Sequence, residues 1–263
     1  NVYICPENRK AYYIHSGEHT IIRRKAEFSE LMSQICDDVY SLTPVINNEA
    51  LNRNEITRIA SNSRGKIISG LLRAELEDNL GLSGTTQEVS IMRSTLIRTG
   101  ILCDDNGRTI IRLKTGNEKM DNVLVEIEKF ITSGGQSPNI CFKNIYDVLC
   151  MPEHHIGLKR GLIPIYIAVV MHKYKQQIVI SNRIGQVPVN ADTLLQINAE
   201  PHQFYLSYVE WNEEKDEYLD ALSNAFSEYV IGSEKSLGSY EFAANAIKRW
   251  YLALPKYSKE AKK

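Results

Sequence analysis

The stretch from residue 85 to residue 113 constrains the fold most, because a helical pattern runs directly into the signal of a tight hairpin. Thr85 followed three residues later by Glu88 is the pattern of a capping box, which predicts that a helix begins there. Gly100 predicts its end, because glycine adopts a positive φ without a steric clash. Four apolar residues recur at helical spacing between these limits: Val89, Met92, Leu96 and Ile97.

Two short strands are predicted after this helix. They are Ile101-Leu102 and Thr109–Leu113. The Asn106-Gly107 pair between them favours a two-residue hairpin turn, since both of its positions need a positive φ. A helix, a strand, a tight turn and a second strand in this order form the second half of a winged helix.

Earlier amphipathic helices support the same unit. The turn from Gly81 to Thr85 is short and contains glycine, as a helix-turn-helix requires. Together with a helix from about Asn117 to Thr132, these features predict a winged-helix domain over residues 27–133. The first earlier helix is marked by Phe28, Leu31, Met32, Ile35 and Val39, and the second, which is expected to end near Gly81, by Ile67, Ile68, Leu71, Leu72 and Leu76.

The helix after Thr85 carries a polar face that is a candidate DNA-binding surface. Ser90, Ser94 and Arg98 follow one another about one turn apart, and Arg93 lies beside them. Such a face can lie in a major groove while Arg108, close to the hairpin turn, contacts a phosphate. The predicted nucleic-acid-binding residues are therefore Ser90, Arg93, Ser94, Arg98 and Arg108.

Basic residues are enriched in this half of the chain, although the whole chain has a net charge of −1. Clustered cations favour phosphate binding, because the release of counterions supplies most nonspecific affinity. The alternative is that the charges only form a solvated face, since winged helices also serve as spacers between proteins or domains. The clustered residues are Arg53, Arg58, Arg64, Lys66 and Arg73, followed by Arg93, Arg98, Arg108, Arg112 and Lys114.

The remaining sequence predicts three further regions. Residues 1–26 are expected to form an N-terminal hairpin and linker from a preceding domain. After a glycine-containing linker at 133–138, residues 139–210 predict a second helical, winged-helix-like domain, and residues 211–263 a helical pair with a basic tail. The expected fold class is mainly α with small β-hairpins (α+β), in which a winged-helix unit precedes a second winged-helix-like unit and a C-terminal helix pair.

The sequence contains no recognisable catalytic motif. It lacks a phosphate-binding loop, a nucleophile elbow, a zinc-protease helix and a dinucleotide-binding glycine pattern. The cysteines lack the close paired spacing of a zinc site, and Cys141 and Cys150, near His154 and His155, are expected on the buried face of a short helix. We therefore expect no catalytic residue, no cofactor and no metal. The longest apolar run, residues 162–171, is too short to span a membrane, and a cytoplasmic location is expected.

Three stretches resemble segments of a known family. They are TPVINNEALNR (Thr43–Arg53) followed by the helix start at Glu88–Ile91, then Pro152 with IGLKRGLIP (Ile156–Pro164), and LPKYS (Leu254–Ser258). In their order and spacing they resemble a downstream helical and winged-helix region of large multidomain bacterial P-loop NTPases from phage-defence (restriction-like) islands. The resemblance covers about residues 28–258.

This resemblance implies that the chain is a non-catalytic module of an antiviral defence protein whose ATPase core lies before Asn1. A chain that begins with asparagine and ends in SKEAKK also predicts a protein fragment. The expected partners are the missing N-terminal ATPase domain, double-stranded DNA and other defence-system subunits, with no membrane. Asn48, Glu49 and Arg53 are candidates for contact with the missing domain, and the alternative is that Asn47-Asn48-Glu49 forms a turn and helix cap.

Three functions stay open at this point. The first is a winged-helix module that couples the ATPase to DNA or to a partner subunit. The second is a free-standing winged-helix DNA-binding regulator, and the third is a pure protein–protein assembly scaffold. The balanced net charge favours the scaffold over a strong DNA binder.

Overall fold

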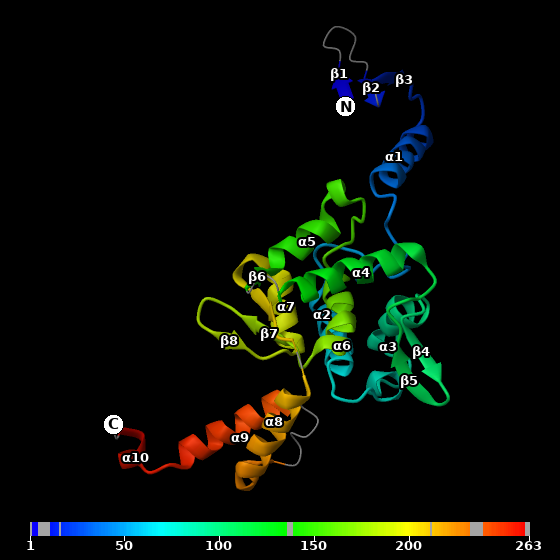
Figure 1. Cartoon of the computed structure of the whole chain (residues 1–263). Coiled ribbons are helices and arrows are strands. Elements are labelled where there is room, and N and C mark those ends of the chain that lie inside the picture. The colour runs from blue at the N-terminus through cyan, green and yellow to red at the C-terminus, as the bar shows by residue number, and fades with distance from the viewer. Residues whose placement is uncertain are drawn as a thin grey trace. The chain divides into compact units, whose positions relative to one another are not determined.

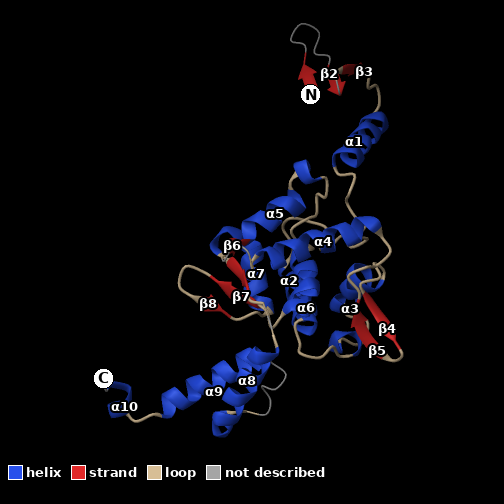
Figure 2. Cartoon of the chain, in the orientation of Figure 1, coloured by secondary structure: helices blue, strands red, loops and turns tan. Residues whose placement is uncertain are grey.

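The computed structural model describes residues 2–4, 11–15, 17–135, 139–210, 212–231 and 239–260. The chain divides into two compact units, residues 1–41 and 42–263 (Figure 1). Among the described residues helices predominate, and each sheet is small and antiparallel (Figure 2). The expected fold class, mainly α with small β-hairpins, is therefore confirmed at this level.

The first unit combines a small sheet with one helix. Strand β1 (Val2–Ile4) pairs with β2 (Ala11–His15), as expected, and β2 also pairs with β3 (Glu18–Thr20). The predicted turn between β1 and β2 lies outside the described residues. Helix α1 (Lys25–Val39) buries none of its residues. This helix lies in the first unit, whereas the sequence placed it in the domain of residues 27–133.

The second unit is built around α6 (Ile163–Tyr174), in which every residue from 163 to 171 is buried. This agrees with the continuous apolar sequence, and Pro164 is accommodated in the first turn, where its missing N–H costs no hydrogen bond. Other described helices contribute buried residues to the same core: α2 (Arg58–Leu71), α3 (Gln87–Met92), α4 (Glu118–Ser133), α5 (Phe142–Cys150) and α7 (Ala191–Ala199).

This core continues across the predicted linker at 133–138. Phe130 of α4 and Phe142 of α5 bring their ring centroids to 5.4 Å. A Cβ at Gly134 would lie 2.9 Å from the backbone nitrogen of Tyr208, so this glycine allows a close approach of two backbones. Glycine serves packing here, and the compact units divide the chain near residue 41 instead.

A four-stranded antiparallel sheet belongs to the same core. Its order is β6-β9-β7-β8, with β6 (Ile140–Cys141), β7 (Ile178–Ser181), β8 (Gln186–Val187) and β9 (Tyr205–Tyr208). Strands β7 and β8 form a hairpin, in which Ile180 pairs with Val187. Short 3-10 turns η3 (Pro152–His154) and η4 (Pro201–Gln203) complete the connections.

The predicted helix–hairpin stretch forms α3 (Gln87–Met92), a π-helical turn η2 (Arg93–Ile97), β4 (Leu102–Asp105) and β5 (Arg108–Ile111). Asn106 and Gly107 have φ values of 55° and 79°, which confirms the expected tight turn. Gly100 also has a positive φ, of 77°.

Helix α2 ends at Leu71, well before the predicted limit near Gly81. The chain turns back so that Leu80, in the 3-10 turn η1 (Asp78–Gly81), lies against Gly70. A Cβ at Gly70 would lie 2.7 Å from the Leu80 Cβ, and Asn79 and Leu80 both have left-handed backbones. A continuous helix cannot include these conformations, so the periodicity of the apolar residues was misleading here.

The C-terminal helices are α8 (Glu213–Ala225), α9 (Ser239–Ala253) and α10 (Lys256–Glu260). The side chain of Asn212 caps α8, because it accepts a hydrogen bond from the Lys215 N–H at 3.1 Å. Helix α8 stops before a 3-10 turn, η5 (Ser227–Tyr229). The rings of Phe226 and Trp250 are 5.3 Å apart, so α8 and α9 do pack together.

Candidate nucleic-acid interface

The start of α3 differs from the predicted capping box. The N-cap residue is Thr86, and its side chain makes no capping hydrogen bond. Glu88 instead accepts a hydrogen bond from Lys66 Nζ at 2.6 Å, and this bond is the main cause that lowers the pKa of the Glu88 carboxyl. The Ser63 hydroxyl also donates to Glu88 at 3.4 Å. The carboxylate thus connects α3 to α2, since a partner on a neighbouring helix competes with the local cap.

The π turn brings two arginines to one side of the helix. Arg98 N–H donates to the Arg93 carbonyl at 2.9 Å, five residues back. In a regular α-helix residues five apart point about 140° away from each other, and the wider π turn reduces this angle. Arg93 and Arg98 are both exposed, and no described carboxylate forms an ion pair with either.

A polar pocket of about 240 Å³ lies at this face. It brings together four of the five predicted nucleic-acid-binding residues and adds neighbours from the loop that precedes α2 and from the start of α3. Its lining consists of Asn47, Thr85, Thr86, Val89, Ser90, Arg93, Ser94 and Arg98. Two cations, several hydroxyls and an amide suit an anion with several oxygens, such as a phosphate.

Ser94 is buried at this site, with only 7% of its surface exposed. Its hydroxyl accepts a hydrogen bond from Asn48 Nδ2 at 2.8 Å and lies 3.0 Å from the Ser90 carbonyl oxygen. The expected regular helix placed Ser90, Ser94 and Arg98 on one exposed face, but Ser94 points inward at the π turn. Ser90, Arg93 and Arg98 are the members of the predicted set that face solvent here.

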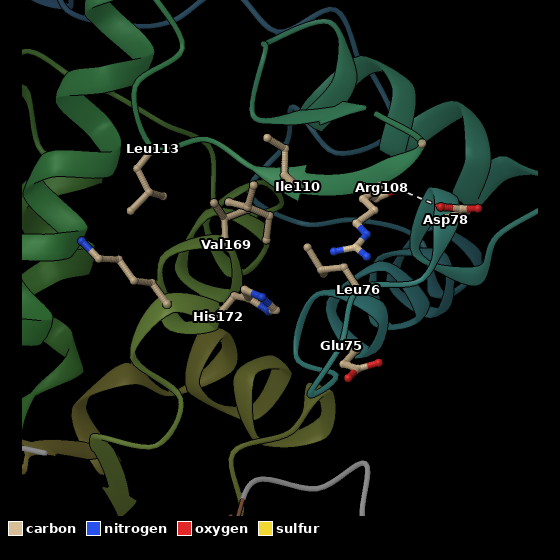
Figure 3. Close-up of a pocket in the computed structure, with 12 residues that line it drawn as sticks. Glu75, Leu76, Asp78, Arg108, Ile110, Leu113, Val169 and His172 are labelled. Carbon is tan, nitrogen blue, oxygen red and sulfur yellow. Dashed lines mark hydrogen bonds between the residues drawn. The ribbon is translucent and has the colours of Figure 1, made fainter. Parts of the chain in front are cut away.

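Arg108, the fifth predicted residue, lines a different pocket. It belongs to β5 and borders a groove of about 780 Å³ between this strand, η1 and the last turns of α6 (Figure 3). The hairpin therefore does not bring Arg108 into the pocket of Arg93 and Arg98.

The predicted interdomain residues have separate environments. Asn48 Oδ1 accepts a hydrogen bond from the Leu51 N–H at 3.0 Å, so the expected turn is present, but no helix follows it directly. Glu49 and Arg53 have exposed side chains. The Arg53 carbonyl accepts a hydrogen bond from the Gly161 N–H at 2.9 Å.

Two of the three stretches that carry the family resemblance meet at this turn. A Cβ at Gly161 would overlap the Leu51 carbonyl oxygen, so only glycine fits where residues 51–53 cross the start of α6. Thr43 donates to the Ile156 carbonyl, which adds a second connection between the stretches. The Asn48–Ser94 hydrogen bond then links this junction to the π turn.

Sequence reasoning missed the role of Arg64. It was counted among the basic residues available to phosphate, but only 4% of its surface is exposed. Its Nη1 donates to the Gly161 carbonyl at 3.0 Å, and burial lowers the pKa of its guanidinium to about 10. The only local signal was its position between small residues on the apolar side of α2.

The described residues contain no group of three or more His, Cys, Asp or Glu side chains arranged to hold a metal ion. Cys141 and Cys150 are only partly buried. Among the described helices, none has the length and apolar character needed to cross a bilayer. No protein-family model, curated protein or solved structure matches the chain.

Proposed function

We propose that residues 42–133 act as a non-catalytic winged-helix module that contacts the backbone of double-stranded DNA through α3 and η2. The observation that carries the proposal is the pair of exposed arginines, Arg93 and Arg98, which the π turn places beside one polar pocket. Between residues 58 and 114 the chain has nine basic and six acidic residues, so this region attracts polyanions although the whole chain does not.

The sequence resemblance supports the proposal that this module belongs to a phage-defence P-loop NTPase, where it would couple the ATPase to DNA or to a partner subunit. The proposed connection between the ATPase and the arginines runs through the turn at Asn48. The Asn48 side chain donates a hydrogen bond to Ser94, which lines the same pocket as Arg93 and Arg98. Glu49 and Arg53 remain exposed on the same turn and are available to a neighbouring domain.

A specific observation favours the assembly scaffold as a second candidate. Ser94 is buried and Arg108 lies in another pocket. The exposed polar surface of α3 and η2 is therefore smaller than the surface that a helix commonly presents when it reads bases in a major groove. For the DNA-binding candidate, the same observation means that the module binds phosphate groups with little sequence preference.

The test is a titration of the whole chain with short duplex DNA at several salt concentrations. Each phosphate contact contributes about 0.9 to the slope of log K against log salt, so Arg93→Ala with Arg98→Ala should lower the slope by up to about 1.8. The control removes the same charge elsewhere, with Lys119→Ala and Arg183→Ala, which are exposed and lie outside the pocket.

The DNA proposal fails if low salt gives no binding, or if both double variants lose affinity equally. The second result would show that only net charge matters. Binding to another protein that survives both double variants would then support the scaffold.

A further inference from the structure

The groove beside β5 has the features of a site for an extended peptide. Its volume is about 780 Å³, and it is bounded by β5, by the segment that includes Leu76 and by the end of α6. Figure 3 shows Arg108 extending from the strand toward Leu76, with Val169 and His172 on the α6 side. Apolar and charged side chains thus line the same space.

The backbone of β5 offers a free edge to this groove. The Arg112 N–H donates to the Ile101 carbonyl at 2.8 Å, and Ile110 pairs with Cys103. Bonded and non-bonded pairs alternate in an antiparallel ladder, so Thr109 and Ile111 direct their N–H and C=O groups away from β4. Within the described chain β5 has no other neighbouring strand.

Arg108 supplies the charge that selects a ligand. No described carboxylate forms an ion pair with it, whereas Lys173 on the opposite wall is 2.8 Å from Glu128. Glu75 and Asp78 also line the groove and would repel an acidic side chain placed beside them. An incoming acidic group is therefore directed to Arg108.

We propose that this groove binds an extended segment of a partner protein, which adds a strand to β5 and places one acidic side chain against Arg108. Unpaired strand edges bind peptides through main-chain hydrogen bonds, and side-chain pockets then provide specificity. Thr109 and Ile111 supply the hydrogen bonds, and the half-buried Leu76 and Leu113 receive apolar side chains that alternate with polar ones along the peptide. This site is separate from the DNA contact proposed at Arg93 and Arg98.

The first measurement is amide hydrogen exchange of the whole chain, with and without synthetic peptides. The probes are acetylated nine-residue peptides that alternate valine and threonine and carry one glutamate at each position in turn. Without peptide, Thr109 and Ile111 should exchange faster than Ile110 and Arg112. A bound peptide should slow the first two amides by roughly tenfold or more, because their N–H groups become paired.

A matched pair of charge reversals tests the role of Arg108. Arg108→Glu should weaken binding of the best glutamate peptide roughly tenfold, because an attraction becomes a repulsion. Arg112→Glu is the control, since Arg112 is exposed on the same segment but does not line the groove. Exchange at Ile110 reports whether each variant keeps its hairpin.

Four results would overturn the proposal. No peptide binds at millimolar concentration, or a peptide binds without protecting Thr109 and Ile111. Protection that rises with protein concentration alone would identify a second copy of the chain as the occupant. Protection of both amides by duplex DNA would identify nucleic acid instead.

Discussion

The two hairpins of the second unit share turn-forming residues but have different surroundings. Both place Asn and Gly at the turn between two short strands, Asn106-Gly107 in one and Asn182 with Gly185 in the other. Strand β7 also pairs with β9, whereas β5 pairs with β4 alone. A hairpin signal therefore predicts two paired strands, but the availability of the outer edge depends on a strand from elsewhere in the chain.

The largest expected difference between the hairpins concerns stability. Ile180 of β7 is fully buried, so Ile180→Ala should lower the free energy of unfolding by about 2–5 kcal/mol. Ile110 of β5 is only half-buried, and Ile110→Ala should cost about 1 kcal/mol. Denaturant unfolding of the two variants measures both values. Equal losses would mean that the β4–β5 hairpin is as fully packed as the larger sheet.

The second prediction concerns pH and the wall opposite β5. Burial lowers the pKa of His172, although the Leu71 carbonyl oxygen, 2.6 Å from its Nδ1, acts in the opposite direction, so the ring is neutral in the folded chain at pH 7. The unfolded chain therefore binds a proton that the folded chain does not, and stability falls as the pH drops from about 6.5 toward the folded pKa. Denaturant unfolding should show this loss.

The matched variant for this prediction is His172→Gln, which keeps a hydrogen-bond donor. It should make stability less dependent on pH between 7 and 5 than in the parent chain. Identical pH profiles would assign the dependence to other groups, and the groove wall would then be insensitive to protonation.

The third prediction is smaller and local to the tip of the β4–β5 hairpin. Gly107 has a φ of 79°, and a Cβ there would meet no atom within 4 Å. Gly107→Ala should therefore cost only the backbone strain, about 1–2 kcal/mol. The melting temperature measures it, and Ser83→Ala, at an exposed loop position, provides a control. A loss above this range would show that the tip of the hairpin packs against another part of the chain.

The smallest expected effect is that of ATP. We expect ATP with Mg²⁺ to leave the melting temperature of this chain unchanged, because the sequence has no phosphate-binding loop. Neither hairpin should respond to the nucleotide in amide exchange. A reproducible thermal shift, or hydrolysis abolished by a substitution within this chain, would contradict this expectation.

Long, strongly patterned segments could be predicted from the sequence. The helix predicted from about Asn117 to Thr132 and the turn at Asn106-Gly107 both occur where they were expected. The limits of α2 and the direction of Ser94 could not be predicted in this way. They depend on Leu80 lying against Gly70 and on a π turn that apolar spacing does not reveal.

The candidate site was also predicted only in part, because the sequence groups residues that are close along the chain and not those that the fold brings together. Ser90, Arg93, Ser94 and Arg98 are close in sequence, and they do line one pocket. Arg108 was expected to join them, but the hairpin carries it to a groove formed with α6. Arg64 was counted as a surface charge and is instead buried against Gly161.

The sequence by itself determined which segments are helices and hairpins, because caps, positive-φ turns and apolar periodicity act within a few residues of the chain. Only the tertiary structure decided which polar side chains are exposed and which strand edge is free. Those outcomes depend on contacts between distant segments, such as Asn48 with Ser94, Arg64 with Gly161, and β7 with β9. Burial and hydrogen bonding across such distances depend on the whole chain, so no local pattern records them.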